Sequence, residues 1–186
     1  MLNDIYKVKS HSDILYGAAQ LSTVYDRLAD EISADLSTSM PILLCVMNGG
    51  LVLTAELLKR LTFPLLLDYV HATRYHDSTE AGTIQWLRQP TASITGKDVL
   101  IIDDILDEGI TMQQIQQACH ETGARSVKSA VLAIKQHDRR VDGVCVDYSG
   151  VTVEDRYVYG CGMDYRGYFR NETSIYALRE TKGEVI

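Results

Sequence analysis

Proline is rare in this sequence, and the segments that usually join or extend domains are missing. Three prolines and 13 glycines are spread over 186 residues, so the chain has neither a Pro/Gly-rich linker nor a low-complexity tail. Hydrophobic residues make up 46% and charged residues 23%, the proportions of a globular protein rather than a disordered one. We therefore expect residues 1–186 to form a single domain.

Long apolar segments and an excess of basic residues are also missing. The longest apolar run, Pro41 to Met47, is too short to span a bilayer, and the first residues lack the apolar core of a signal peptide. The 25 acidic residues outnumber the 18 basic ones, which gives a net charge of −7. This balance disfavours binding along the phosphate backbone of DNA or RNA. We expect neither a membrane nor a nucleic acid as a partner.

Cysteine and histidine show no pattern that is typical of a metal site. The four cysteines are far apart and form no C-x-x-C pair: Cys45, Cys119, Cys145 and Cys161. This usage predicts reduced thiols in the cytoplasm rather than a disulfide framework or a zinc site. The five histidines, His137 among them, lack metal-ligand spacing, so the sequence assigns them no function.

Hydrophobic patterning predicts alternating helices and strands. Apolar residues recur at spacings of three and four between Leu21 and Ile32, which predicts a helix that Ser12 or Asp13 would cap. The run 42–47 does not alternate, as in a strand buried on both faces. Further strands are expected at 65–70, 83–87, 98–102 and 127–134, helices at 51–61 and from 111 to the glycine at 123, and a polar loop at 71–82. This order predicts an α/β domain with a mostly parallel sheet flanked by helices.

The segment 99–111, VLIIDDILDEGIT, joins a buried strand to a helix and carries four acids, Asp103, Asp104, Asp107 and Glu108. Ligands of open α/β sheets bind at the carboxyl ends of the strands, where these acids are expected. Two adjacent acids point to opposite sides, so one can face a bound sugar while the other supports the site. The backbone N–H groups of the following turn and helix start suit a phosphate. A solvated strand end is the simpler alternative, but four acids in six residues disfavour it.

Two common nucleotide-binding motifs do not explain this segment. A nucleoside triphosphatase needs a glycine-rich loop that ends in Lys-Ser or Lys-Thr, whereas Lys97 is followed by Asp98. The dinucleotide fingerprint fails after Gly160 and Gly162, because Tyr165 stands where its third glycine should be. The acidic segment therefore indicates another kind of phosphate-bearing ligand.

The same thirteen residues resemble the phosphoribosyl-pyrophosphate signature of the type I phosphoribosyltransferases. The resemblance implies that Asp103 and Asp104 hold the ribose hydroxyls. It implies that the residues after them hold the 5′-phosphate: Asp107, Glu108, Gly109, Ile110 and Thr111. It also implies the type I phosphoribosyltransferase fold, a mostly parallel central sheet flanked by helices with a small hood. The core would span about 38–137, and the hood would combine the N-terminal segment with 138–186.

Two further segments resemble loops of the family members that act on hypoxanthine and guanine. Val46 to Gly50 resembles their pyrophosphate loop, so Met47, Asn48 and Gly49 would contact pyrophosphate, with a cis peptide bond between Met47 and Asn48. The commoner form of this loop has lysine where this chain has Asn48. The stretch from Thr73 to Gly82 resembles a loop that closes over the substrates, which gives Arg74 and Tyr75 a binding role. Many members have Ser-Tyr at that place. Closure would exclude water from a reactive sugar.

A third segment resembles the purine pocket of those members. The resemblance gives Lys135 a hydrogen bond to the 6-oxo group, Tyr157 a stacking face and Val158 backbone contacts to the base. It makes Asp164 a ligand of a magnesium ion bound with pyrophosphate, and Arg170 a pyrophosphate contact. A lysine donor favours a 6-oxo purine over a 6-amino purine, since an amine offers no such acceptor.

Together these features predict an enzyme of purine salvage. It would transfer phosphoribosyl from phosphoribosyl pyrophosphate to hypoxanthine or guanine, with Asp107 taking the proton from N7 of the base. The substrate's phosphates would be repelled by the acids without a cation, so we expect Mg²⁺, held by Asp103, Asp104 and Asp164. The resemblance further implies a homodimer or homotetramer. The alternatives are a xanthine-preferring transferase, a non-catalytic regulator that senses phosphoribosyl pyrophosphate, and a metal-binding acidic domain.

Overall fold

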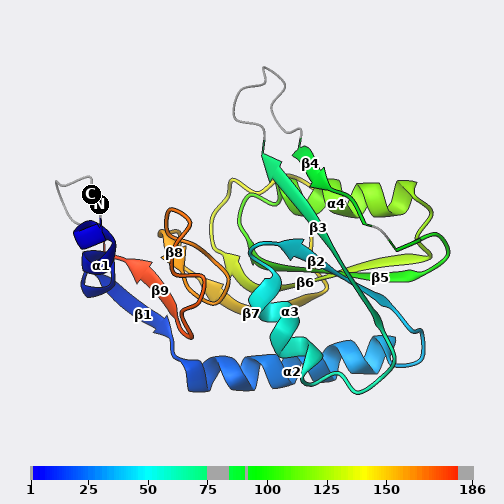
Figure 1. Ribbon diagram of the computed structural model, residues 1–186, viewed down its shortest axis with the longest axis horizontal. Coiled ribbons are helices and arrows are strands. Elements are labelled where there is room, and N and C mark those ends of the chain that lie inside the picture. Colours follow the sequence, from blue (N-terminus) through cyan, green and yellow to red (C-terminus); the bar gives the residue numbers. More distant parts are fainter. Residues whose placement is uncertain (1, 75–83, 91, 180–186) are drawn as a thin grey trace.

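The structure, a computed structural model, describes residues 2–74, 84–90 and 92–179. Figure 1 shows a six-stranded sheet with helices on both faces and a smaller three-stranded sheet beside it. The helices are α1 (Leu2–Ser10), α2 (Ala18–Leu36), α3 (Leu51–Leu58) and α4 (Ile110–Glu121). The strands of the large sheet are β2 (Ile42–Met47), β3 (Leu66–Arg74), β4 (Ile84–Arg88), β5 (Asp98–Leu106), β6 (Ser126–Lys135) and β7 (Tyr148–Val153). Those of the small sheet are β1 (Ser12–Tyr16), β8 (Val158–Tyr159) and β9 (Ile175–Leu178).

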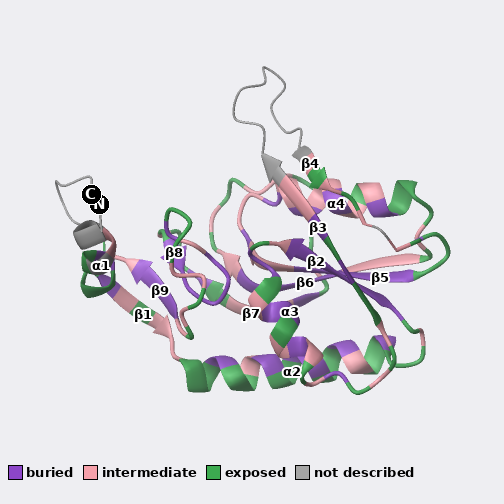
Figure 2. Ribbon diagram, viewed as in Figure 1, coloured by how far each residue is buried: buried purple, intermediate pink, exposed green. Residues whose placement is uncertain are grey.

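The large sheet confirms the predicted mostly parallel arrangement. Its order is β4-β3-β2-β5-β6-β7, and β4 is the strand that runs antiparallel to its neighbour. Its central strands are buried on both faces (Figure 2). Leu43 packs into the core that includes α2 and α3, whereas Leu44 packs into the core that includes α4. Two apolar faces explain why these strands are continuous apolar runs without alternation.

The expected cap of the second helix is wrong. Ser12 and Asp13 belong to β1, which pairs with β9, and α2 begins after Gly17. The backbone N–H of Gly17 donates a hydrogen bond to the side chain of Gln20, at 2.9 Å, which closes the helix start. Pairing with a strand more than 160 residues away along the chain overrides the local capping preference of Ser12 and Asp13.

Several predicted elements have different lengths in the structure. β5 does not end at Ile102 but continues to Leu106, because its ladder with β6 extends to the pair Leu106 and Ile134. β3 continues through the first four residues of the predicted loop, and α3 ends at Leu58, three residues earlier than expected. The rest of that loop, 75–82, lies outside the described residues.

The small sheet has an aromatic core of its own. Its strands are antiparallel in the order β1-β9-β8, and Tyr159, Tyr165 and Tyr176 pack there with Val8 of α1. The predicted core of 38–137 leaves out α2 and β7, both of which belong to the large-sheet layer. The division into a core and a hood stays a prediction. No helix among the described residues is long and apolar enough to cross a membrane.

Candidate active site

A cavity of about 750 Å³ lies where β2, β5 and β6 end, between the large sheet and the loop that follows β8. The predicted residues that line it are Met47, Asn48, Gly49, Asp103, Asp104, Asp107, Gly109, Thr111, Lys135, Tyr157, Val158, Asp164 and Arg170. Of the other predicted residues, Glu108 lies in the turn before α4 and Ile110 is the first residue of α4, and neither lines the cavity. Arg74 is placed by its backbone alone, at the end of β3, and Tyr75 lies outside the described residues. The structure thus brings together side chains that lie more than 100 residues apart in the chain.

The adjacent acids Asp103 and Asp104 lie inside β5, not after its end as the sequence suggested. The side chain of Asp103 accepts a hydrogen bond from the backbone N–H of Asp104, at 2.9 Å, and that of Asp104 accepts one from Ile105, at 2.8 Å. Burial raises the pKa of both carboxyl groups, and the charge of Asp104 raises that of Asp103 further. Two acids held close in a poorly hydrated site favour a cation beside them.

The loop after β2 packs closely against β5 because Gly49 and Gly50 carry no side chain. A Cβ on Gly49 would be 2.2 Å from Oδ2 of Asp104, and one on Gly50 would be 2.3 Å from the carbonyl oxygen of Ile102. Any larger residue would therefore push the loop away from the acids. The peptide bond between Met47 and Asn48 is cis, as expected.

The turn from β5 into α4 presents a helix start to the cavity. Gly109 precedes the helix with a φ of 86°, and a Cβ there would be 2.5 Å from Cγ1 of Val144. The carbonyl of Glu108 accepts a hydrogen bond from the backbone N–H of Val141, at 2.9 Å, which fixes the turn. The first N–H groups of a helix have no partner within the helix, and Thr111 adds a hydroxyl beside them. This arrangement suits a phosphate group.

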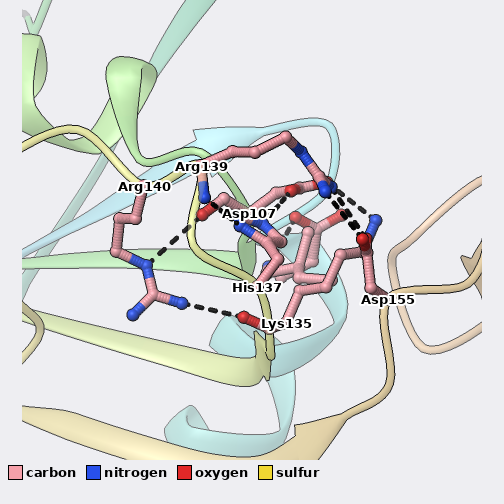
Figure 3. Close-up of polar contacts among 8 residues, drawn as sticks. Asp107, Lys135, His137, Arg139, Arg140 and Asp155 are labelled. Atoms are coloured by element: carbon pink, nitrogen blue, oxygen red, sulfur yellow. Dashed lines mark hydrogen bonds and ion pairs between the residues drawn. The ribbon is translucent and has the colours of Figure 1, made fainter.

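Asp107 lies at the centre of a polar cluster at the ends of β5 and β6 (Figure 3). Nζ of Lys135 is 2.8 Å from its Oδ2, and Nε2 of His137 is 2.6 Å from its Oδ1. Burial alone would raise the pKa of Asp107, but the hydrogen bonds from Lys135 and His137 lower it overall. Asp107 is therefore a carboxylate at neutral pH. His137 is the polar residue of this site that the sequence did not identify.

The opposite side of the cavity carries an aromatic ring and an ion pair. Tyr157 is 48% exposed, and its ring meets the edge of Tyr165 at 5.4 Å between centroids. The guanidinium of Arg170 lies 2.5 Å from Oδ1 of Asp164 and donates to the carbonyl of Gly162, at 2.6 Å. It is also 3.8 Å from Oδ2 of Asp104, so it links the two sides of the cavity.

The carboxylates fit a magnesium ion that arrives with a phosphate ligand. Among the described residues, no group of three or more His, Cys, Asp or Glu side chains is placed to hold a metal ion by itself. Magnesium, however, is commonly held by one or two carboxylates together with substrate phosphates and waters. The side chains of Asp103, Asp104 and Asp164 line the same cavity, so carboxylate oxygens are available there for this kind of binding.

The comparison that decides the family is a match of the phosphoribosyl transferase domain to residues 11–166. The chain belongs to the phosphoribosyltransferase family. A hypoxanthine-guanine phosphoribosyltransferase of Streptococcus pneumoniae is 32% identical over 180 residues, 96% of each chain. A hypoxanthine-guanine-xanthine phosphoribosyltransferase of Tritrichomonas foetus is 29% identical and covers 97% of this chain and 96% of its own.

Solved structures agree with this assignment. A hypoxanthine phosphoribosyltransferase of Staphylococcus aureus superposes with a TM-score of 0.84 at 28% identity, over 90% of this chain and 91% of that one. The type I phosphoribosyltransferase fold and the resemblance to the members acting on hypoxanthine and guanine are thereby confirmed. The chain is an enzyme of this family.

Proposed function

We propose that this phosphoribosyltransferase transfers the phosphoribosyl group of phosphoribosyl pyrophosphate to hypoxanthine or guanine and releases pyrophosphate, a reaction of purine salvage. The observation that carries this proposal is the pairing of Lys135 and Asp107 at 2.8 Å beside the acids of β5. A cationic donor next to a carboxylate matches the 6-oxo group and the N7–H of a purine, which are neighbours on its ring. A 6-amino purine such as adenine does not match this pair, because the lysine has no acceptor for the 6-amino group.

In this proposal, different side chains contact different atoms of the base. Lys135 donates to the 6-oxo group, and Asp107 accepts the N7 proton as N9 attacks the sugar, which increases the nucleophilicity of the base. Tyr157, half-exposed at the cavity, stacks on the ring, and the backbone of Val158 in β8 contacts its edge. Hypoxanthine and guanine share the atoms that these residues would contact.

The phosphate-bearing substrate would occupy the remainder of the cavity. Its ribose hydroxyls would face Asp103 and Asp104, and its 5′-phosphate would bind the turn and helix start that include Gly109 and Thr111. The pyrophosphate group would bind the loop after β2 and the guanidinium of Arg170. The roles of Arg74, Tyr75, Glu108 and Ile110 stay predictions from the resemblance.

We also propose Mg²⁺ as the cation of this site, held by Asp103, Asp104 and Asp164. The ion would offset the negative charge of the pyrophosphate as it leaves. The carboxylate of Asp164 would exchange its present partner, Arg170, for the ion.

The decisive experiment measures pyrophosphate release from phosphoribosyl pyrophosphate with Mg²⁺ and each of hypoxanthine, guanine, xanthine and adenine. We expect turnover with hypoxanthine and guanine, little with adenine, and none after the metal is chelated. Preference for xanthine would favour the second candidate function, a xanthine-preferring phosphoribosyltransferase. The name of the Tritrichomonas foetus relative, which includes xanthine, supports that candidate. Binding of phosphoribosyl pyrophosphate without turnover of any base would instead favour a regulator.

A homodimer or homotetramer in the cytoplasm is the proposed form of the enzyme. The strand pair β3–β4 exposes the large apolar side chains of Leu66, Leu67, Tyr69 and Leu87, which a second copy could bury. All four cysteines lie in the described ranges and are free thiols, which fits a reducing compartment. Sedimentation equilibrium of the purified protein tests the assembly, and a monomer at micromolar concentration would contradict it.

A further inference from the structure

His137 lies two residues after the end of β6. One of its ring nitrogens faces Asp107, and the other faces the backbone of the turn to which His137 belongs. Its side chain is 2% exposed, and its Nε2 lies 2.6 Å from Oδ1 of Asp107. On the other side of the ring, the backbone N–H of Arg139 donates to Nδ1, at 3.1 Å. Because Nδ1 accepts a hydrogen bond, the ring proton is on Nε2 and is donated to Asp107. These two hydrogen bonds hold the imidazole ring in one orientation.

The other charged groups of the cluster have different partners (Figure 3). Arg139 binds Asp155 through both terminal nitrogens, at 2.7 and 2.8 Å. Arg140 donates to the backbone carbonyls of Lys135, at 2.8 Å, and Asp107, at 3.4 Å. Within the described part of the chain, the side chains bonded to the Asp107 carboxylate are thus Lys135 on Oδ2 and His137 on Oδ1.

These two partners differ in what they can do when a base arrives. Lys135 has a flexible stem and, under the proposed function, a second acceptor in the 6-oxo group of the purine. His137 is buried, and both of its ring nitrogens already have hydrogen-bond partners, so we expect its bond to Oδ1 to persist when a base binds. When Lys135 moves to the base, Oδ2 is released toward N7 while Oδ1 stays bound.

We propose that His137 is a positioning residue that fixes Oδ1 of Asp107, so that Oδ2 can exchange Lys135 for the N7 proton of the base. This proposal rests on the proposed function. In the step itself, the N7–H bond breaks and an O–H bond forms on Oδ2, while the N9 lone pair bonds to the sugar carbon. Pyrophosphate leaves with the electron pair of its bond to that carbon. The proton of His137 stays on Nε2 throughout.

The test compares His137→Leu with His137→Gln and with the control His120→Leu, which removes an exposed histidine of α4. We expect His137→Leu to lower kcat/KM for hypoxanthine by about tenfold to a hundredfold, the effect of losing a hydrogen bond to a charged group. The acid limb of its pH profile should move to higher pH, since the lost hydrogen bond raises the pKa of Asp107. Glutamine can donate from a similar position, so His137→Gln should keep most of the wild-type kcat/KM. The acid limb of its pH profile should lie near the wild-type pH.

An unchanged acid limb in His137→Leu, or a glutamine variant as impaired as the leucine one, would overturn the proposal. If the leucine variant does not fold, NMR of the wild-type protein still tests the proposal. The ¹⁵N and ¹H resonances of the His137 ring at pH 7 show which ring nitrogen carries a proton. We expect a proton on Nε2 and none on Nδ1, because Nδ1 accepts from Arg139, and a proton on Nδ1 would refute the arrangement. Absence of transferase activity in the wild type with every purine would reject the proposed function but leave that spectroscopic result unaffected.

Discussion

The two sides of the cavity are built in different ways. On the sheet side, Asp104, Asp107 and Lys135 extend from β5 and β6 or the turn after them, inside a continuous parallel ladder with apolar cores on both faces. On the opposite side, Asp164 and Arg170 lie in a loop held by isolated bridges between Gly160 and Met163 and between Tyr165 and Tyr168. The geometry of the first side is fixed by the ladder of the large sheet, whereas that of the second is fixed by backbone hydrogen bonds within its own loop.

The electrostatics of the two sides follow from this difference. Burial and close neighbours shift the pKa values of Asp103, Asp104 and Asp107, as expected where proton transfer and metal binding need specific protonation states. Across the cavity, Asp164 and Arg170 bind each other in a partly exposed ion pair that substrate groups can replace. The comparison predicts that changes to Asp107 and Lys135 on the sheet side alter the rate and the choice of base, whereas changes on the opposite side alter binding and local stability.

The largest effect is expected for Asp107→Asn on the sheet side. The amide keeps the shape of the side chain but cannot accept the N7 proton, so turnover should fall by about a hundredfold to ten-thousandfold. Steady-state kinetics with saturating hypoxanthine and phosphoribosyl pyrophosphate measure this loss, and thermal unfolding shows whether the fold persists. Normal turnover would remove Asp107 from the mechanism.

A smaller effect on rate, but a clear one on selectivity, is expected for Lys135→Ala. Loss of a charged donor to the 6-oxo group should reduce the preference for hypoxanthine over adenine by about tenfold to a hundredfold. The KM for phosphoribosyl pyrophosphate should change little, because under the proposed function its groups would bind elsewhere in the cavity. Competition between the two bases gives the ratio, and an unchanged ratio would refute the assigned contact.

The sheet side could be predicted from the sequence because its signals are local. Continuous apolar runs identify β2 and β5 as strands buried on both faces. The acids of 103–108 are neighbours of the start of α4 along the chain as well as in space. The boundaries were less accurate, since the length of β5 depends on its ladder with β6. Most of the predicted site residues do line the cavity, whereas their chemical roles stay predictions.

The small sheet could not be predicted in the same detail, because its order comes from contacts between residues that are distant in the chain. β1 pairs with β9 across about 160 residues, and β8 has two residues, too few to carry a periodic pattern. His137 was missed for a related reason. It lies past the end of β6, and its partner Asp107 is 30 residues away in another loop.

The junction between the two sides can be tested by Gly162→Ala. Gly162 has a φ of 107°, and a Cβ there would lie 2.2 Å from the carbonyl oxygen of Gly49. Left-handed backbone and overpacking together should cost about 2–4 kcal/mol of unfolding free energy. Gly167→Ala is the matched control, because its φ is 86° but its Cβ would meet nothing within 4 Å. We expect about 1–2 kcal/mol there, and equal losses in urea unfolding would show that the junction is not tightly packed.

The smallest effect concerns the end of β5 away from the cavity, where Asp98→Asn tests how firmly the sheet side is held. Arg125 donates to the Asp98 carboxylate at 2.9 and 2.5 Å and Ser126 at 2.8 Å, and these hydrogen bonds lower its pKa despite burial. A carboxylate with a lowered pKa stabilises the fold above its unfolded pKa of about 3.9, and this contribution is lost as the pH falls further. We expect the variant to be less stable by about 1–2 kcal/mol at pH 7, with a difference that shrinks below pH 4. Urea unfolding at pH 7 and pH 3 measures both values, and a difference independent of pH would show that the charge of Asp98 does not stabilise the sheet.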